Sequence, residues 1–173
     1  MIELRSDERV WVTGDVHIGP EDDVRAEEFL AFLSAARAGC DRLVLLGDVF
    51  DFWIGPHHGR GCSYRRVIEA FEAASAAGFP VDFIPGNRDF LGIGELRAIG
   101  LRPQGDAVVY QREGERTLVT HGDLLVKGDH GYRRYRAVVR SALFRLAYWL
   151  VPMFIRLWVA RRLRGASTRK LSR

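Results

Sequence analysis

The sequence has few cysteines, no acidic residue after Asp129 and no long uninterrupted apolar run. Its 173 residues include two cysteines, Cys40 and Cys62, which excludes a disulfide-rich secreted fold and a zinc-finger cysteine pair. The first residues carry acids and lack the apolar core of a signal peptide, so we expect a cytoplasmic protein. With 47% hydrophobic and 28% charged residues, the composition is that of an ordinary folded domain, not of a disordered chain.

Charge is distributed unevenly along the chain. Residues 1–129 contain 14 Lys+Arg and 22 Asp+Glu, whereas residues 130–173 contain 12 Lys+Arg and no acid. The basic part is also rich in Leu, Val, Phe and Trp, a combination that suits an anionic amphiphile such as a lipid phosphate or a membrane surface. A nucleic-acid-binding arm does not need this aliphatic bulk, so we expect no nucleic-acid partner.

Short apolar runs alternate with helical stretches through most of the chain. The order of strand, helix and strand indicates an α/β sandwich. Apolar runs flanked by Gly, Asp or Pro predict strands over residues 9–13, 43–46, 81–84, 107–111 and 117–120. Helical spacing predicts helices over residues 24–38 and 64–77.

The last part of the sequence predicts a helical cap. Residues 132–164 have a helical pattern that is interrupted at Pro152, which lacks the N–H that a helix interior needs. We therefore expect three parts: a core over 1–131, a cap of two helices over 132–164 that faces lipid, and a basic tail over 165–173. The most apolar run, 142–160, contains two arginines besides the proline, which favours helices lying on a membrane over a spanning helix.

Four polar motifs each follow directly on a predicted strand. They are Gly14-Asp15-Val16-His17, Gly47-Asp48-Val49-Phe50-Asp51, Gly86-Asn87-Arg88-Asp89 and His121-Gly122-Asp123. One such motif alone is typical of an ordinary turn, but four in this arrangement are not explained by chance. Because ligands bind at the carboxyl ends of the strands in α/β sheets, five side chains are expected to meet there: Asp15, His17, Asp48, Asn87 and His121.

These residue types predict a pair of divalent cations. Asp15 and His17 are two residues apart in extended chain and can bind one ion. Asp48 has two oxygens and can bridge both ions, while Asn87 and His121 supply an amide oxygen and an imidazole to the second. Mixed nitrogen and oxygen ligands suit Mn²⁺, the expected ion, or Fe or Zn. Two ions about 3.5–4 Å apart clamp a phosphoryl group and activate a water molecule.

The motif order D-x-H, G-D-x-x-D, G-N-x-D and H-G-D resembles the calcineurin-like metallophosphoesterase superfamily. That resemblance implies a sandwich of two β-sheets flanked by helices. Within the superfamily the sequence is most similar to the bacterial UDP-2,3-diacylglucosamine pyrophosphatases of lipid A synthesis, through residues 47–55, 86–91, 121–123 and 129–132. This similarity implies cleavage of a lipid-linked sugar nucleotide to lipid X and UMP by an enzyme associated peripherally with the inner membrane.

The resemblance also implies roles for individual residues. Most of the superfamily has His where this chain has Arg88; a guanidinium is a poor acid, so we expect Arg88 to neutralise phosphoryl charge. Asp51 and Asp89 are expected to orient the ligands or turns around them. The expected catalytic residues are Asp48, Asn87 and Arg88, and the expected substrate-binding residues are Asn87, Arg88, Asp129, Tyr132, Arg164 and Ser167. For Arg164 and Ser167, exposed polar positions on a basic helix pair remain an equal alternative.

The sequence departs from the family in one respect. Family members continue past the cap to a Gly-His-x-His motif, and this sequence reaches Arg173 without one. We expect either a truncated chain or an incomplete metal centre, with His57, His58 and His130 exposed to solvent rather than acting as replacement ligands. Two alternatives to the pyrophosphatase stay open: a generic phosphodiesterase or nucleotide phosphatase, and a non-catalytic lipid-binding remnant. The oligomeric state is also open.

Overall fold

The computed structural model describes residues 1–51, 53, 63–89, 93–123, 125, 130–152 and 155. They belong to two compact units, residues 1–127 and residues 128–173. In the described residues, the first unit contains two β-sheets and three helices, and the second contains two helices.

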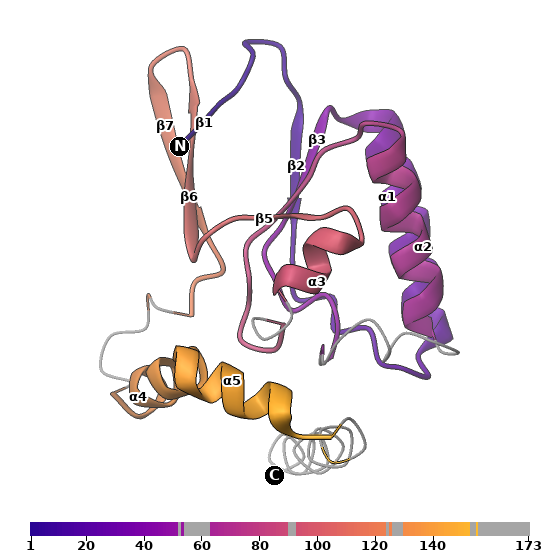
Figure 1. Cartoon of the computed structure of the whole chain (residues 1–173). Coiled ribbons are helices and arrows are strands. Elements are labelled where there is room, and N and C mark those ends of the chain that lie inside the picture. Colours follow the sequence, from indigo (N-terminus) through magenta and orange to yellow (C-terminus); the bar gives the residue numbers. More distant parts are fainter. Residues whose placement is uncertain are drawn as a thin grey trace, which may run out of the picture. The chain divides into compact units, whose positions relative to one another are not determined.

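The larger sheet of the first unit has four parallel strands in the order β2-β3-β4-β5. Their bounds are β2 Val10–Thr13, β3 Arg42–Leu45, β4 Val81–Phe83 and β5 Arg102–Pro103. Helices α1 (Asp23–Gly39) and α2 (Ser63–Ala76) cover one face of it (Figure 1), and α3 (Ile93–Ala98) precedes β5. Leu43 and Leu45 of β3 are fully buried in the cluster that these helices form. Phe29 and Phe71 join α1 to α2 edge to face, with ring centroids 5.7 Å apart.

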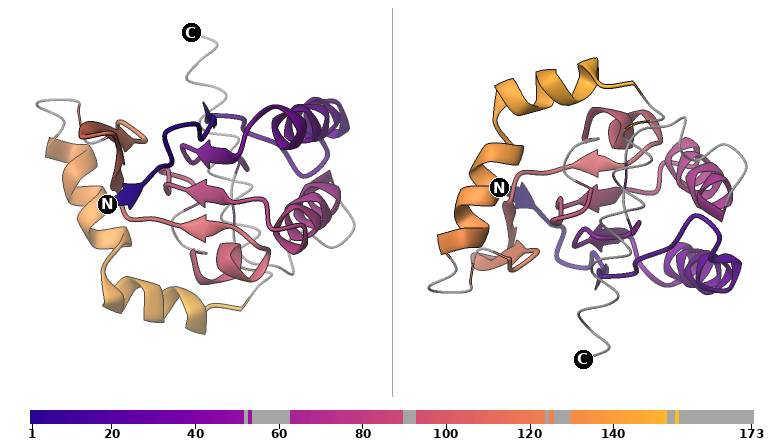
Figure 2. Two further views of the ribbon diagram at one scale, coloured as in Figure 1. Left: turned by 90° about the horizontal axis from the view of Figure 1, so that it is seen from above. Right: turned by 90° about the horizontal axis from the view of Figure 1, so that it is seen from below.

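The smaller sheet has three strands in the order β1-β6-β7. Strand β1 (Ile2–Glu3) pairs in parallel with β6 (Ala107–Arg112), and β6 pairs in antiparallel fashion with β7 (Glu115–Thr120). Glu113 and Gly114 both have positive φ, +50° and +88°, as a two-residue type I′ turn requires. Seen from above, this sheet lies across the four-stranded sheet from α1 and α2 (Figure 2).

A second apolar cluster joins the two sheets. Val44 and Ile84 from β3 and the end of β4 pack with Val108 and Tyr110 of β6. Because side chains alternate along a strand, Val44 points into this cluster while Leu43 and Leu45 point to the helices. The predicted α/β sandwich of two sheets flanked by helices is therefore confirmed.

An ionic network at the start of β3 also connects the sheets. Arg42 donates to Glu8 at 2.7 Å and to Asp82 at 2.9 Å. The Tyr110 hydroxyl, from the other sheet, donates to the same Asp82 oxygen at 2.7 Å. Glu8 and Asp82 are both buried, so Arg42 compensates charges that would otherwise be costly inside the protein.

All five predicted strands and both predicted helices of the first unit are present, with ends that shift by at most two residues. Strands β1 and β5 and helix α3 were not predicted. Two-residue strands are too short to show a periodicity, and α3 spans six residues, fewer than two full helical turns. Pairing with neighbouring strands, β6 for β1 and β4 for β5, defines the two short strands.

The second unit contains helices α4 (His130–Val139) and α5 (Ala142–Leu150). The chain breaks between them at Ser141, whose side chain accepts a hydrogen bond from the Phe144 N–H at 3.1 Å and caps α5. The predicted interruption at Pro152 agrees with the end of α5 at Leu150, but the break at Ser141 was not predicted. None of the helices in the described residues is both long and apolar enough to cross a membrane.

Candidate metal centre

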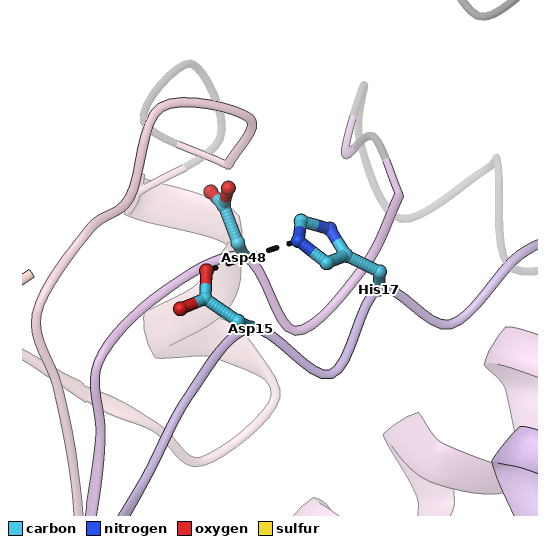
Figure 3. Close-up of side chains that lie close together, drawn as sticks. All are labelled: Asp15, His17 and Asp48. Atoms are coloured by element: carbon cyan, nitrogen blue, oxygen red, sulfur yellow. Dashed lines mark ion pairs between the residues drawn. The ribbon is translucent and has the colours of Figure 1, made fainter. Parts of the chain in front are cut away.

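Three side chains that follow neighbouring parallel strands converge at the carboxyl end of the larger sheet. Asp15 and His17 follow β2, and Asp48 follows β3 (Figure 3). One potential ligand atom from each lies within 4.8 Å of those of the other two, and Asp15 Oδ1 is 3.7 Å from His17 Nε2. The predicted meeting of these three residues is therefore seen in the structure.

The backbone at all three positions is left-handed. The φ angles are +54° at Asp15, +55° at His17 and +51° at Asp48, a conformation that residues with a side chain adopt at a cost. Hydrogen bonds between the loop after β2 and the loop after β3 stabilise this conformation. The Asp15 N–H donates to the Gly47 carbonyl at 3.2 Å, and the His17 N–H donates to the Asp48 carbonyl at 2.9 Å. The pairing of β2 with β3 thus continues into the loops and fixes the direction of the side chains.

Two glycines allow the loops after β3 and β4 to touch. Gly47 has a φ of +73°, and a Cβ there would collide with the backbone of Gly86. A Cβ on Gly86 would in turn collide with the Asp48 carboxylate. The glycines beside the acidic and amide residues are therefore required by close backbone approach.

Asp48 is the most enclosed member of the cluster, with 2% of its side chain exposed. Its Oδ1 accepts a hydrogen bond from the Arg88 N–H at 3.0 Å, while its Oδ2 is 3.8 Å from Arg88 Nε. Beneath it, Asp89 is fully buried and accepts from the Gly86 N–H at 2.8 Å. Burial, and secondly the negative charge of Asp48, raise the pKa of Asp89 to about 7.

The three side chains fit a bound cation. His17 Nδ1 is buried without a hydrogen-bond partner in the described part of the chain, and Nε2 is too far from Asp15 for a hydrogen bond. Two carboxylates and an imidazole, with ligand atoms within 4.8 Å of one another, offer a cation both oxygen and nitrogen donors. Such a mixed donor set suits Mn²⁺, Fe or Zn better than Ca²⁺.

His121 follows β7 and has its ring oriented by the main chain. Its Nδ1 contacts the carbonyl oxygen of Leu46, two residues before Asp48. A carbonyl only accepts, so Nδ1 carries a hydrogen, and in the neutral ring Nε2 is then the nitrogen that can bind a metal. The close group of His and acidic side chains found among the described residues contains Asp15, His17 and Asp48 but not His121. Sequence patterns do not reveal the contact between His121 and Leu46, because its acceptor is a main-chain carbonyl.

Arg88 lies beside the cluster and also contacts Asp51. Its Nη1 is 3.3 Å from Asp51 Oδ1 and 3.4 Å from the Asp51 carbonyl oxygen. Neighbouring Asn87 is exposed. Tyr132 lies in α4 of the second unit, and His130 is exposed at the start of that helix. The remaining predicted positions lie outside the described residues: His57, His58, Asp129, Arg164 and Ser167.

Comparison with known proteins gives one family and a consistent set of relatives. Residues 8–152 match the family described as calcineurin-like phosphoesterase. The chain is 36% identical over 159 residues to a UDP-2,3-diacylglucosamine hydrolase of Aeromonas hydrophila, covering 88% of this chain and 64% of the relative. It is 38% identical to the protein of that name from Xanthomonas campestris over 88% of this chain and 62% of the relative. The chain thus spans a little less than two thirds of the length of these relatives.

Proposed function

The chain belongs to the calcineurin-like phosphoesterase family, and on that premise we propose that it is a metal-dependent pyrophosphatase. The proposed substrate is a lipid-linked sugar nucleotide, UDP-2,3-diacylglucosamine, and the products are lipid X and UMP. The observation that carries the proposal is the cluster of Asp15, His17 and Asp48 at the carboxyl ends of β2 and β3. The names of the relatives support the choice of substrate.

In this proposal Asp15, His17 and Asp48 hold one divalent ion, and Asp48, Asn87 and His121 hold a second, with Mn²⁺ as the expected metal. When bound, such a pair polarises phosphoryl oxygens and lowers the pKa of a water molecule. The protein contributes fixed positions: the Leu46 carbonyl holds the His121 ring, and the left-handed backbone holds Asp15, His17 and Asp48.

Arg88 and Asn87 are proposed to contact the phosphoryl group. A guanidinium is a poor acid, so Arg88 would stabilise negative charge on the phosphoryl oxygens without transferring a proton. Asp129, Tyr132, Arg164 and Ser167 are proposed to bind the remaining phosphate and the glucosamine, as the family resemblance implies.

We also propose that residues 132–164 form a cap that receives acyl chains and touches an anionic membrane, with residues 165–173 as a basic tail. Leu143, Leu146 and Leu150 of α5 are 77%, 61% and 78% exposed. Arg133 and Arg134 of α4 are exposed as well. Apolar and cationic side chains of this kind bind the acyl boundary and the headgroup phosphates, respectively. In a cell this would place the protein on the inner membrane from the cytoplasmic side.

Hydrolysis followed by ³¹P NMR tests the proposal. With Mn²⁺, the protein should convert UDP-2,3-diacylglucosamine to UMP and lipid X, and EDTA should stop the reaction. Asp48→Asn should lose at least about a hundredfold in kcat, because the carboxylate that would hold both ions loses its charge, whereas the control Asp7→Asn, at an exposed acid before β2, should not. Faster cleavage of bis(p-nitrophenyl) phosphate than of the lipid substrate would support a generic phosphodiesterase. No Mn²⁺-dependent cleavage of either compound would contradict the proposal.

A further inference from the structure

The guanidinium of Arg88 lies between two carboxylates with different surroundings. On one side Nε is 3.8 Å from Asp48 Oδ2, beyond hydrogen-bond distance. On the other side Nη1 is 3.3 Å from Asp51 Oδ1 and 3.4 Å from the Asp51 carbonyl oxygen. Two acceptors of Asp51 therefore bind the guanidinium within hydrogen-bond distance, whereas Asp48 Oδ2 lies beyond it.

Asp51 is itself firmly placed. Its N–H donates to the Ile18 carbonyl at 2.9 Å, and Phe50 beside it is fully buried and stacked on Trp53, with ring centroids 4.9 Å apart. The Asp51 side chain is 14% exposed and that of Arg88 36%. An anchor with this little freedom determines the position of a more exposed and longer partner, and not the reverse.

Among the described residues, the other carboxylate that forms an ion pair with Arg88 is that of Asp48. A shift of about 1 Å brings Nε from 3.8 Å to hydrogen-bond distance of Asp48 Oδ2. A guanidinium bonded to that oxygen neutralises the carboxylate and occupies the site where a cation binds. A cation and Arg88 thus compete for Asp48.

We infer that Asp51 is a positioning residue that holds Arg88 off Asp48. It leaves the Asp48 carboxylate free for a divalent cation, and it leaves Nη2 of Arg88, which bonds to none of the described residues, free for a phosphoryl oxygen. The part of this inference that concerns the phosphoryl oxygen rests on the proposed function; the part that concerns Asp48 rests only on the contacts of Arg88.

Mn²⁺ affinity of four proteins tests the inference without any turnover: the unaltered chain, Asp51→Ala, Arg88→Gln and the double variant. Asp51→Ala should weaken Mn²⁺ binding about tenfold, since residues that share a network are coupled. In the Arg88→Gln background the same change should have less than about a threefold effect, because the competing guanidinium is gone. Equal weakening in both backgrounds would overturn the inference.

Asp51→Asn distinguishes the loss of the side-chain contact with Arg88 from the loss of a nearby negative charge. It removes the charge but keeps a side-chain oxygen that can accept from Arg88, which Asp51→Ala lacks, while both variants keep the main-chain carbonyl contact. Asp51→Asn should therefore weaken Mn²⁺ binding less than Asp51→Ala. If Asp51→Asn and Asp51→Ala weaken Mn²⁺ binding equally, charge alone accounts for the effect, and anchoring is contradicted. The Asn variant also keeps the test possible if Asp51→Ala does not fold.

The Arg88 Nε–H signal in ¹H–¹⁵N NMR gives a readout that needs no metal. The signal is identified by its loss in Arg88→Gln. Asp51→Ala should shift it and speed its exchange with water, and an unchanged signal would contradict anchoring. If the unaltered chain binds no Mn²⁺, the proposed metal function fails, while this signal still decides whether Asp51 holds Arg88.

Discussion

At the scale of single residues, the candidate centre combines function with backbone strain. Asp15, His17 and Asp48 all have left-handed φ angles, which favour glycine, yet all carry the side chains that a metal needs. Asp15 is the informative position, because its side chain is 70% exposed and its removal leaves no cavity. Backbone strain of this kind is found preferentially at functional sites, which fits the proposed role of Asp15.

Replacing Asp15 tests this strain. Asp15→Gly and Asp15→Ala both remove the carboxylate and should both lose Mn²⁺ binding. The Gly variant should nevertheless be about 1 kcal/mol more stable to urea than the Ala variant, because only Ala carries a Cβ in the left-handed region. The same pair of changes at Asp7, which has no positive φ, should show Ala at least as stable as Gly. A more stable Ala variant at Asp15 would show that the backbone there is not strained.

Glu8 sets part of the acid sensitivity of the fold. Burial acts to raise its pKa, but hydrogen bonds from Arg42 and the Arg5 N–H and the charge of Arg42 outweigh burial and lower the pKa below its ordinary 4.5. A carboxyl group whose pKa is lower in the folded protein than in the unfolded chain stabilises the fold at pH values above its unfolded-state pKa. That stabilisation is lost as the pH falls through its folded-state pKa.

Glu8→Gln should therefore flatten the pH dependence of stability. The unaltered chain should lose stability as pH falls below 4.5, and the variant should lose less over the same interval. At pH 7 the variant should be about 1–2 kcal/mol less stable, since Arg42 loses a charged partner. Urea unfolding at several pH values measures the stability at pH 7 and its decrease toward acid pH. Glu72→Gln on the exposed face of α2 is the control. An equally steep acid limb in Glu8→Gln would exclude this role.

At the scale of elements, the centre depends on how closely the loops after β3 and β4 pass each other. The sequence predicted both strands and the motifs after them, because their apolar runs and glycines are local signals. It did not predict the left-handed backbone or the contact of Gly86 with Asp48, since these arise only when two loops distant in sequence are placed side by side. For the same reason the network of Glu8, Arg42 and Asp82 was not foreseen.

Gly86→Ala tests that loop contact. The added methyl collides with the Asp48 carboxylate, so the variant should lose Mn²⁺ affinity at least tenfold and about 1–3 kcal/mol of stability through overpacking. Gly94→Ala in α3 is the matched control, because its added Cβ has no neighbour within 4 Å. It should be neutral or slightly stabilising. Gly86→Ala with unchanged Mn²⁺ affinity would mean that the position of Asp48 does not depend on this contact.

At the scale of the whole molecule, an acidic α/β part and a basic helical part share one chain. The charge division at residue 129 is visible in the sequence, and so is the helical character of the second part. The cap of Ser141 that divides α4 from α5 is a single side-chain contact inside a continuous helical pattern, so it was not predicted. The substrate-binding roles of Asp129, Arg164 and Ser167 stay predictions.

Vesicle co-sedimentation tests the proposed membrane contact. The protein should pellet with anionic vesicles at low salt, and binding should weaken at high salt as headgroup attraction is screened. Replacing Leu143 and Leu150 by Ser should reduce binding severalfold, since these exposed side chains would enter the acyl boundary. Leu118→Ser, at a Leu 63% exposed on β7, is the control. Binding that is equal for neutral and anionic vesicles, or absent, would contradict a peripheral contact with anionic lipid.

Anomalous X-ray scattering from crystals grown with Mn²⁺ tests whether the ends of β2 and β3 form a divalent-metal centre. An anomalous peak should lie among Asp15, His17 and Asp48, at about 2.0–2.3 Å from their ligand atoms. Crystals of Asp48→Asn should have no such peak. Ordered side chains at these three residues with no peak among them, or a peak that remains in Asp48→Asn, would contradict a metal centre at this position.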